Sequence, residues 1–173
     1  MELLEVLDIN GNKTGEVLDR ETIHKNNILH YEVFCMIIND KKEVLLQKRS
    51  ANKKHNPNIY AITAGHVTSG ENLKGAMARE LKEELSIDVN ENDLKEYTDR
   101  RIKIRGKNSN VSVYYYIICN MDTKDFIVQK EELSEVKWFK VNEIVDMIKN
   151  KDPKVVWGED AIPFFEIVNS IDI

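Results

Sequence analysis

The chain has 173 residues, of which 42% are hydrophobic and 32% charged, and its formal net charge is −5 at pH 7. This size and composition are typical of one globular domain, so we expect residues 1–173 to form a single domain with its own core. The acidic balance excludes a broad basic surface for a nucleic-acid polymer and disfavours attraction to an acidic membrane.

Three features of the sequence favour a cytoplasmic protein. The first residues are acidic and lack the basic and apolar segments of a secretion signal. The apolar runs fall far short of the ~18 residues that a membrane-spanning helix requires. The two cysteines, Cys35 and Cys119, give no disulfide framework and favour a reducing compartment.

The first part of the chain predicts short strands. Asn10-Gly11 is a strong turn signal between two weakly alternating runs, so we expect an N-terminal hairpin over about residues 1–20. The elements predicted next, in chain order, are strands at 32–39 and 43–47, a polar loop at 48–58, and a short strand at 59–63, which Gly65 terminates.

A helix at 72–86, rich in strong helix formers, is the clearest element of the second part. The elements predicted after it are strands at 94–105, 111–119 and 136–139, a helix at 143–150 capped by Asn142, and a last helix at 160–169. Strands and helices mix without strict βαβ alternation. The expected fold class is therefore α/β of the α+β type, with a mixed sheet flanked by helices.

The helix at 72–86 places three carboxylates on one face. Each helical residue advances by about 100°, so Glu84 lies about 40° and Glu83 about −60° from Glu80. Such a group of like charges requires cations. Ion pairs on a solvated acidic face would supply them, and so would a bound divalent metal ion. The glycine-bounded loop 65–70, just before the helix, favours the metal because its backbone groups lie near the helix N-terminus.

The stretch from Gly65 to Ile87 resembles the Nudix box, in which glycine, glutamate and an Arg-Glu-aliphatic-x-Glu-Glu-x-Gly-aliphatic segment recur at fixed spacing. Eight of the nine fixed positions match: Gly65, Glu71, Arg79, Glu80, Leu81, Glu83, Glu84 and Ile87. Ser86 is the departure, since the family usually has there a glycine that closes the helix. The resemblance implies a Nudix α/β/α sandwich and hydrolysis of a phosphoanhydride bond.

The resemblance also implies roles. Glu80, Glu83 and Glu84 match the acids that bind Mg²⁺ in the family, with Mn²⁺ as a substitute, and Glu80 or Glu84 also matches the base. The backbone carbonyl of Gly65 is an additional metal ligand by the same comparison. Glu71 and Arg79 match a pair that supports the loop and positions the acids. Family members act on small diphosphate-containing molecules and often form homodimers.

Residues around the box are similar to a subgroup that includes isopentenyl-diphosphate isomerase and its hydrolase relatives. An isomerase needs a cysteine just before the glycine-histidine pair and a further glutamate on a later strand. Thr63 and Ala64 stand at the first place, and the stretch 108–113 has no acid at the second. Isomerisation requires a proton donor and acceptor across the double bond, so hydrolysis is the favoured activity.

Further candidates lie outside the box. His24, His30 and His66 resemble positions that hold a second metal in the isomerase group, although lone histidines are more often structural. A basic loop could bind the substrate phosphates, and it could equally be a solvated basic surface. Its candidate residues are Lys48, Arg49, Lys53 and Lys54, together with Tyr60. The candidates for an extra acid are Glu131, Glu132 and Glu135, or else these form a solvated acidic loop.

Two other classes of function remain as alternatives. One is a catalytically silent Nudix-fold binding module, which would not require all three glutamates. The other is an interaction domain whose acidic helix is only a solvated surface. The favoured hypothesis is Mg²⁺-dependent hydrolysis of a nucleoside diphosphate linked to another moiety, or of a related diphosphate.

Overall fold

The computed structural model describes residues 1–97, 101–103 and 109–173. Contacts between Cα atoms divide the chain into two compact units. Unit 1 consists of Met1–Cys35, Ala64–Glu80 and Val89–Tyr116. Unit 2 consists of Met36–Thr63, Leu81–Asp88 and Ile117–Ile173. A single domain over residues 1–173 stays a prediction.

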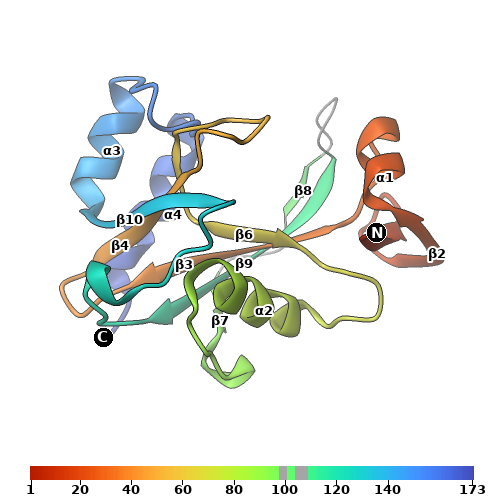
Figure 1. Cartoon of the computed structure of the whole chain (residues 1–173), viewed down its shortest axis with the longest axis horizontal. Helices are drawn as coiled ribbons and strands as arrows, with labels where there is room; N and C mark the ends of the chain where they lie inside the picture. The colour runs from red at the N-terminus through yellow and green to blue at the C-terminus, as the bar shows by residue number, and fades with distance from the viewer. Residues whose placement is uncertain (98–100, 104–108) are drawn as a thin grey trace. The chain divides into compact units, whose positions relative to one another are not determined.

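The fold is of the α+β type with a mixed sheet, as predicted (Figure 1). The strands of the described chain are β1 Leu3–Leu7, β2 Lys13–Asp19, β3 Tyr31–Ile38, β4 Glu43–Arg49, β5 Tyr60–Ala61, β6 Thr63–His66, β7 Lys95–Glu96, β8 Arg101–Lys103, β9 Asn110–Ile118 and β10 Leu133–Lys140. The α-helices are α1 Arg20–Asn26, α2 Leu73–Leu85, α3 Val141–Lys149 and α4 Ile162–Glu166. Within the described ranges, no helix has the length and apolarity needed to cross a bilayer.

In unit 1, β1 and β2 form the predicted antiparallel hairpin, and α1 follows directly. Gly11 adopts φ +81° in the turn, where the Asp8 carboxylate accepts from the backbone N–H of Asn12 at 2.9 Å. Helix α1 was not predicted. Its sequence signal is Asp19, whose carboxylate accepts from the N–H of Thr22 at 2.9 Å and caps the helix. Buried Ile23 packs this helix onto Leu4 and Val6 of the hairpin.

Also in unit 1, β9 pairs antiparallel with β7 and with β8. The predicted strand at 94–105 is therefore divided, and its residues 98–100 and 104–105 lie outside the described residues. Residues 108–113, where an isomerase has its later glutamate, begin at Asn108, which also lies outside the described residues. Ser109 directly precedes β9, and Asn110 and Ser112 lie at its start; all three are buried.

In unit 2, β4 pairs with β10 along seven residue pairs from Glu43↔Lys140 to Arg49↔Leu133. This pairing corrects the predicted loop at 48–58, because Lys48 and Arg49 belong to the strand. Strand β5 then pairs with β4 through Tyr60 and Ala61. The single strand predicted at 59–63 is thus two short strands, β5 and β6.

The two helices of unit 2 near the chain end differ from prediction in their bounds. Helix α3 begins at Val141, so Asn142 lies inside it and not at the cap; the N–H of Lys140 instead donates to the Glu143 carboxylate at 2.8 Å. Its buried side chains recur at helical spacing: Val141, Ile144, Val145 and Ile148. The helix predicted at 160–169 is the short α4, with 3₁₀ turns on both sides.

Candidate active site and histidine cluster

Helix α2 carries the three glutamates of the box and was predicted correctly to within one residue at each end. Asn72 precedes it, and its side-chain oxygen accepts from the N–H of Gly75 at 2.7 Å. Along the helix, Glu80 is partly buried, Glu83 is exposed and Glu84 is buried, at 8% exposure. The helical spacing of the acids is therefore as predicted, but their exposure differs widely.

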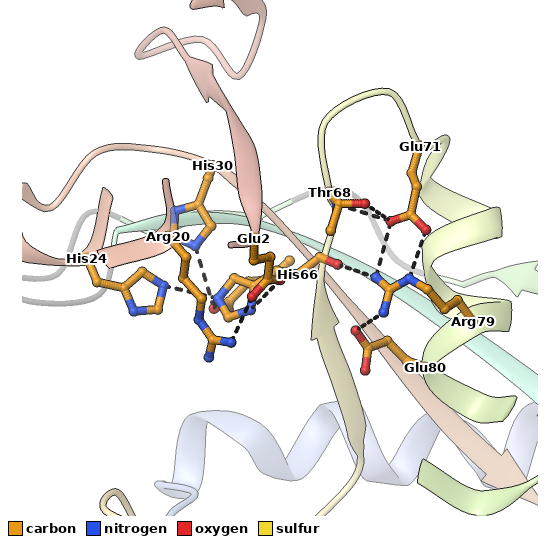
Figure 2. A network of polar contacts seen from close by, with 10 residues as sticks. Glu2, Arg20, His24, His30, His66, Thr68, Glu71, Arg79 and Glu80 are labelled. Atoms are coloured by element: carbon orange, nitrogen blue, oxygen red, sulfur yellow. Dashed lines mark hydrogen bonds and ion pairs between the residues drawn. The ribbon is translucent and has the colours of Figure 1, made fainter. Parts of the chain in front are cut away.

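Arg79 in unit 1 joins the box loop to the first acid (Figure 2). Its guanidinium donates two bonds to the Glu71 carboxylate, at 2.8 and 3.1 Å. It also donates to the Glu80 carboxylate at 2.7 Å and to the backbone carbonyl of His66 at 3.0 Å. Arg79 thus holds Glu71, Glu80 and strand β6 together through a planar, two-pronged donor.

The Glu71 carboxylate is held from both sides. It accepts from the Thr68 hydroxyl at 2.7 Å and from the Thr68 N–H at 3.1 Å, in addition to Arg79. Burial alone would raise the pKa of Glu71, but the bonds from Arg79 and Thr68 outweigh it and lower that pKa. The bond to Glu71 in turn raises the pKa of Arg79. Both groups are therefore charged, and the loop is tied to the helix as an ion pair.

Gly65 is the box residue with the tightest surroundings. A Cβ atom at this position would overlap the Glu80 carboxyl group. Only glycine lets the β6 backbone lie this close to the acid. The contact gives a physical reason for glycine at the first position of the box, and it places the Gly65 backbone beside Glu80.

In unit 2, Glu84 is bonded to a residue that the sequence did not indicate. The side-chain amide of Gln47 donates to the Glu84 carboxylate at 2.7 Å. The hydroxyl of Thr63 donates to the oxygen of the same amide at 2.9 Å, which fixes the amide with its NH₂ toward Glu84. All three residues are buried. The available signal was a glutamine that follows apolar Leu45 and Leu46 in a predicted strand.

The helix ends at the departure from the box. Ser86 adopts φ +56°, the left-handed conformation that the family's glycine would take more easily. Its N–H donates to the carbonyl of Lys82, and the N–H of Ile87 donates to that of Leu81. These bonds close the helix as a glycine C-cap does. Serine in place of glycine therefore adds backbone strain at the C-terminus of α2 but leaves the hydrogen bonds that end the helix unchanged.

The predicted phosphate-binding residues of unit 2 do not all meet. Lys48 and Tyr60 converge on Glu135: the Tyr60 hydroxyl donates to it at 2.7 Å, and the Lys48 ammonium lies 3.3 Å away. Burial, followed by the bond to Glu135, raises the pKa of Tyr60 to about 12. Arg49 instead donates to the carbonyl of His55, and Lys54 is exposed.

The candidate extra acids are placed separately. Glu132 forms an ion pair with Lys53, whereas Glu131 is exposed. Glu135 is bonded to Tyr60, and this bond lowers its pKa. Lys48 and Lys53 thus each form an ion pair with a carboxylate, so part of the positive charge of this basic segment is neutralised within the protein.

His24, His30 and His66 come together in unit 1, as Figure 2 shows. One ring nitrogen of each lies within 4.8 Å of the others. Burial lowers the pKa of His66 to about 4, so its ring is neutral at neutral pH and able to bind a metal. Among the residues described, this is the group of side chains with metal-ligand spacing. The resemblance to the isomerase group predicted these three histidines as candidates, but it did not predict Glu32, the acid beside them.

The comparisons with known proteins identify the family and the fold. The NUDIX domain family model matches residues 28–158. The chain is 27% identical over 164 residues to isopentenyl-diphosphate Delta-isomerase 2 of Photorhabdus laumondii, covering 93% of this chain and 90% of the relative. It is 29% identical to Nudix hydrolase 3 of Arabidopsis thaliana, covering 90% of this chain and 21% of that protein.

A crystal structure of a Deinococcus radiodurans protein has the same fold, with a TM-score of 0.72 at 18% identity and 98% of both chains covered. The family model spans most of the chain, and it includes the loop, the helix and the acids of the box. The chain therefore belongs to the NUDIX family and is a pyrophosphohydrolase.

Proposed function

We propose that the protein hydrolyses a phosphoanhydride bond in a nucleoside diphosphate linked to another moiety, or in a related diphosphate, with Mg²⁺ bound at the box. The observation that carries this proposal is the helix α2, which bears Glu80, Glu83 and Glu84 at the spacing of the box. Nudix enzymes generally use a divalent metal, and carboxylate oxygens suit a hard cation such as Mg²⁺.

The residues present fit such a cation. The Glu80 carboxylate lies against the backbone of Gly65, whose carbonyl is the additional ligand that the family resemblance implies. When bound, the metal would neutralise diphosphate oxygens and lower the pKa of a water molecule. Arg79 and Glu71 position Glu80, while Gln47 positions Glu84. In this proposal Glu80 or Glu84 takes the proton from the attacking water.

Substrate phosphates would be bound by Lys48, Arg49, Lys54 and Tyr60. The support is the positive charge of the three basic side chains and, for Tyr60, its position beside Lys48, whose ammonium lies 5.8 Å from the centre of the Tyr60 ring. Glu131 and Glu132 remain candidates for an additional acid. A second metal at His24, His30 and His66 is part of the same proposal and is supported by the spacing of their nitrogens.

Isopentenyl-diphosphate isomerisation is the second candidate. The Photorhabdus relative is named as such an isomerase, and its similarity to this chain covers 90% of its length. The residues argue against it, since Thr63 and Ala64 provide no thiol where an isomerase needs one. Both activities act on a diphosphate, so one substrate panel separates them.

The test is a panel of diphosphates with Mg²⁺, including ADP-ribose, nucleotide sugars, dinucleotides and isopentenyl diphosphate, with products separated by chromatography. We expect cleavage of at least one phosphoanhydride and no isomerised isopentenyl diphosphate. Glu84→Gln should lower turnover by at least ~100-fold, as expected for loss of a ligand or base. Glu166→Gln, at an exposed acid of unit 2, should have wild-type turnover. Full activity of Glu84→Gln would refute the role of Glu84, and dimethylallyl diphosphate as a product would establish the second candidate.

A further inference from the structure

The histidine cluster draws its ligand atoms from three separate segments of unit 1. His24 lies on α1, His30 directly precedes β3, and His66 ends β6. The Nε2 atoms of His24 and His66 face one another at 3.1 Å. Neighbouring ring centroids are 5.0–5.3 Å apart, so the three rings surround one small volume.

His30 is oriented toward that volume. Its Nδ1–H donates to the carbonyl of Ile28 at 3.0 Å, which leaves Nε2 as the atom with a lone pair. The side chain is buried, and Nε2 has no hydrogen-bond partner within the part of the chain that the structure describes. A buried acceptor without a donor is unfavourable, and a metal ion at the centre of the cluster would give this lone pair a partner.

Glu32 provides a fourth atom. Its Oε1 lies 3.4 Å from Nε2 of His66 and 3.8 Å from Nε2 of His30. Its other oxygen accepts from the side-chain amide of Asn110, which orients the carboxylate. The other ring nitrogen of His66 also faces an acid, since Nδ1 lies 3.9 Å from the Glu2 carboxylate. Metal ligands are commonly oriented by outer partners of this kind.

Three separations within the cluster are close to one coordination geometry. Zinc binds nitrogen and oxygen ligands at about 2.0–2.2 Å, and ligands at the corners of a tetrahedron are then about 3.3–3.6 Å apart. The separations of 3.1, 3.4 and 3.8 Å bracket that range, and the three histidine nitrogens all lie within 4.8 Å of one another, so a bound zinc ion would draw the rings slightly closer together. Three imidazoles with one carboxylate suit a borderline metal better than Mg²⁺, which prefers a shell of oxygens.

We propose that Glu32 is the fourth ligand of a closed, tetrahedral zinc site with His24, His30 and His66, and that this zinc is structural. The proposal rests on the second metal site of the proposed function and adds its fourth ligand, its metal and its role. Four protein ligands leave no open position for water, which is the arrangement of structural zinc. The zinc would tie α1 to β3 and β6 within unit 1.

The test measures metal binding directly. The full-length protein is stripped with a chelator and titrated with Zn²⁺ in the presence of excess Mg²⁺, and zinc content is measured by mass spectrometry. We expect one zinc per wild-type chain and at least ~100-fold weaker binding for Glu32→Gln, more than the loss for an outer partner. Glu16→Gln, at an exposed acid of β2, should bind as wild type does. Unchanged zinc affinity of Glu32→Gln would remove Glu32 from the site.

Replacement of zinc by Co²⁺ tests the coordination geometry without any substitution in the protein. Co²⁺ in the wild-type protein should show the intense visible absorption of a tetrahedral complex, and a weak octahedral spectrum would overturn the proposal even if Glu32→Gln failed to fold. Glu84→Gln should keep its zinc while losing hydrolysis. If zinc binds as expected and no diphosphate is cleaved, the proposed hydrolysis fails while the zinc site stands.

Discussion

Gln47 and Thr63 form a buried hydrogen-bonded chain behind Glu84. Because the Thr63 hydroxyl donates to the Gln47 carbonyl oxygen, the amide NH₂ is left for the carboxylate. A bond from an amide to a charged group contributes roughly 1.5–3 kcal/mol, and it also fixes the direction of the carboxylate. We infer that Gln47 is a positioning residue for Glu84 and does not itself touch the substrate.

We predict that Gln47→Leu raises the Mg²⁺ concentration for half-maximal activity by about tenfold, the equivalent of about 1.4 kcal/mol. The physical reason is that Glu84 loses the donor that directs it. Steady-state assays over a Mg²⁺ series measure this, and circular dichroism checks the fold.

Gln129→Leu is the matched control, because Gln129 is exposed and its backbone N–H still donates to the Glu84 carbonyl after substitution. It should leave the Mg²⁺ dependence unchanged. Equal Mg²⁺ dependence in Gln47→Leu and the wild type would show that the buried amide serves packing alone.

At the scale of elements, α2 is the part of the chain where sequence and structure agree best. Its apolar spacing, strong helix formers and a side-chain cap all favour a helix over the same residues. Its exit is the exception, because Ser86 takes a left-handed conformation without being glycine. For an L-residue with a side chain this conformation is unfavourable by roughly 1–2 kcal/mol.

Ser86→Gly is therefore expected to raise the free energy of unfolding by about 1 kcal/mol, the strain relieved less the entropy that glycine adds to the unfolded chain. Urea unfolding followed by circular dichroism measures the change. Ser86→Ala keeps the strain and should gain nothing. If both substitutions destabilised the protein equally, the hydroxyl of Ser86, and not its backbone conformation, would be the property that matters.

Other elements show why local patterns are not sufficient. The length of β4 depends on its partner β10, which lies more than eighty residues away in sequence, so a basic stretch that resembles a loop is strand at Lys48 and Arg49. Helix α1 has seven residues, with Ile23 buried against the hairpin, and is too short to give a clear periodicity. Its cap at Asp19 was visible, but the packing that stabilises it was not.

At the scale of the whole molecule, the residues of the proposed sites differ in how far the sequence predicts them. Those of the box stand at fixed spacing from Gly65 to Ile87, so the sequence alone proposes them as candidates. Gln47 and Glu32 come from strands, and each meets its partner only through tertiary contact. No local pattern around Glu32 reveals its position beside His30 and His66.

Metal binding should be visible in the stability of the whole chain. A ligand that binds only the folded state stabilises it by RT ln(1 + [L]/Kd), or about 2.7 kcal/mol at one hundred times Kd. We predict that Mg²⁺ raises the melting temperature of the wild type and leaves that of a Glu80→Gln, Glu83→Gln, Glu84→Gln triple variant unchanged. Differential scanning fluorimetry at constant ionic strength measures both. An identical rise in the two proteins would mean that Mg²⁺ binds elsewhere.

His66 contributes to two sites with two different parts of itself. Its ring belongs to the histidine cluster, while its backbone carbonyl accepts from Arg79 of the box. A carbonyl is common to every amino acid, so the support of Arg79 is indifferent to which side chain stands at position 66. A substitution that removes the imidazole would therefore disrupt the proposed zinc site and leave the hydrogen bond that supports Arg79 in place.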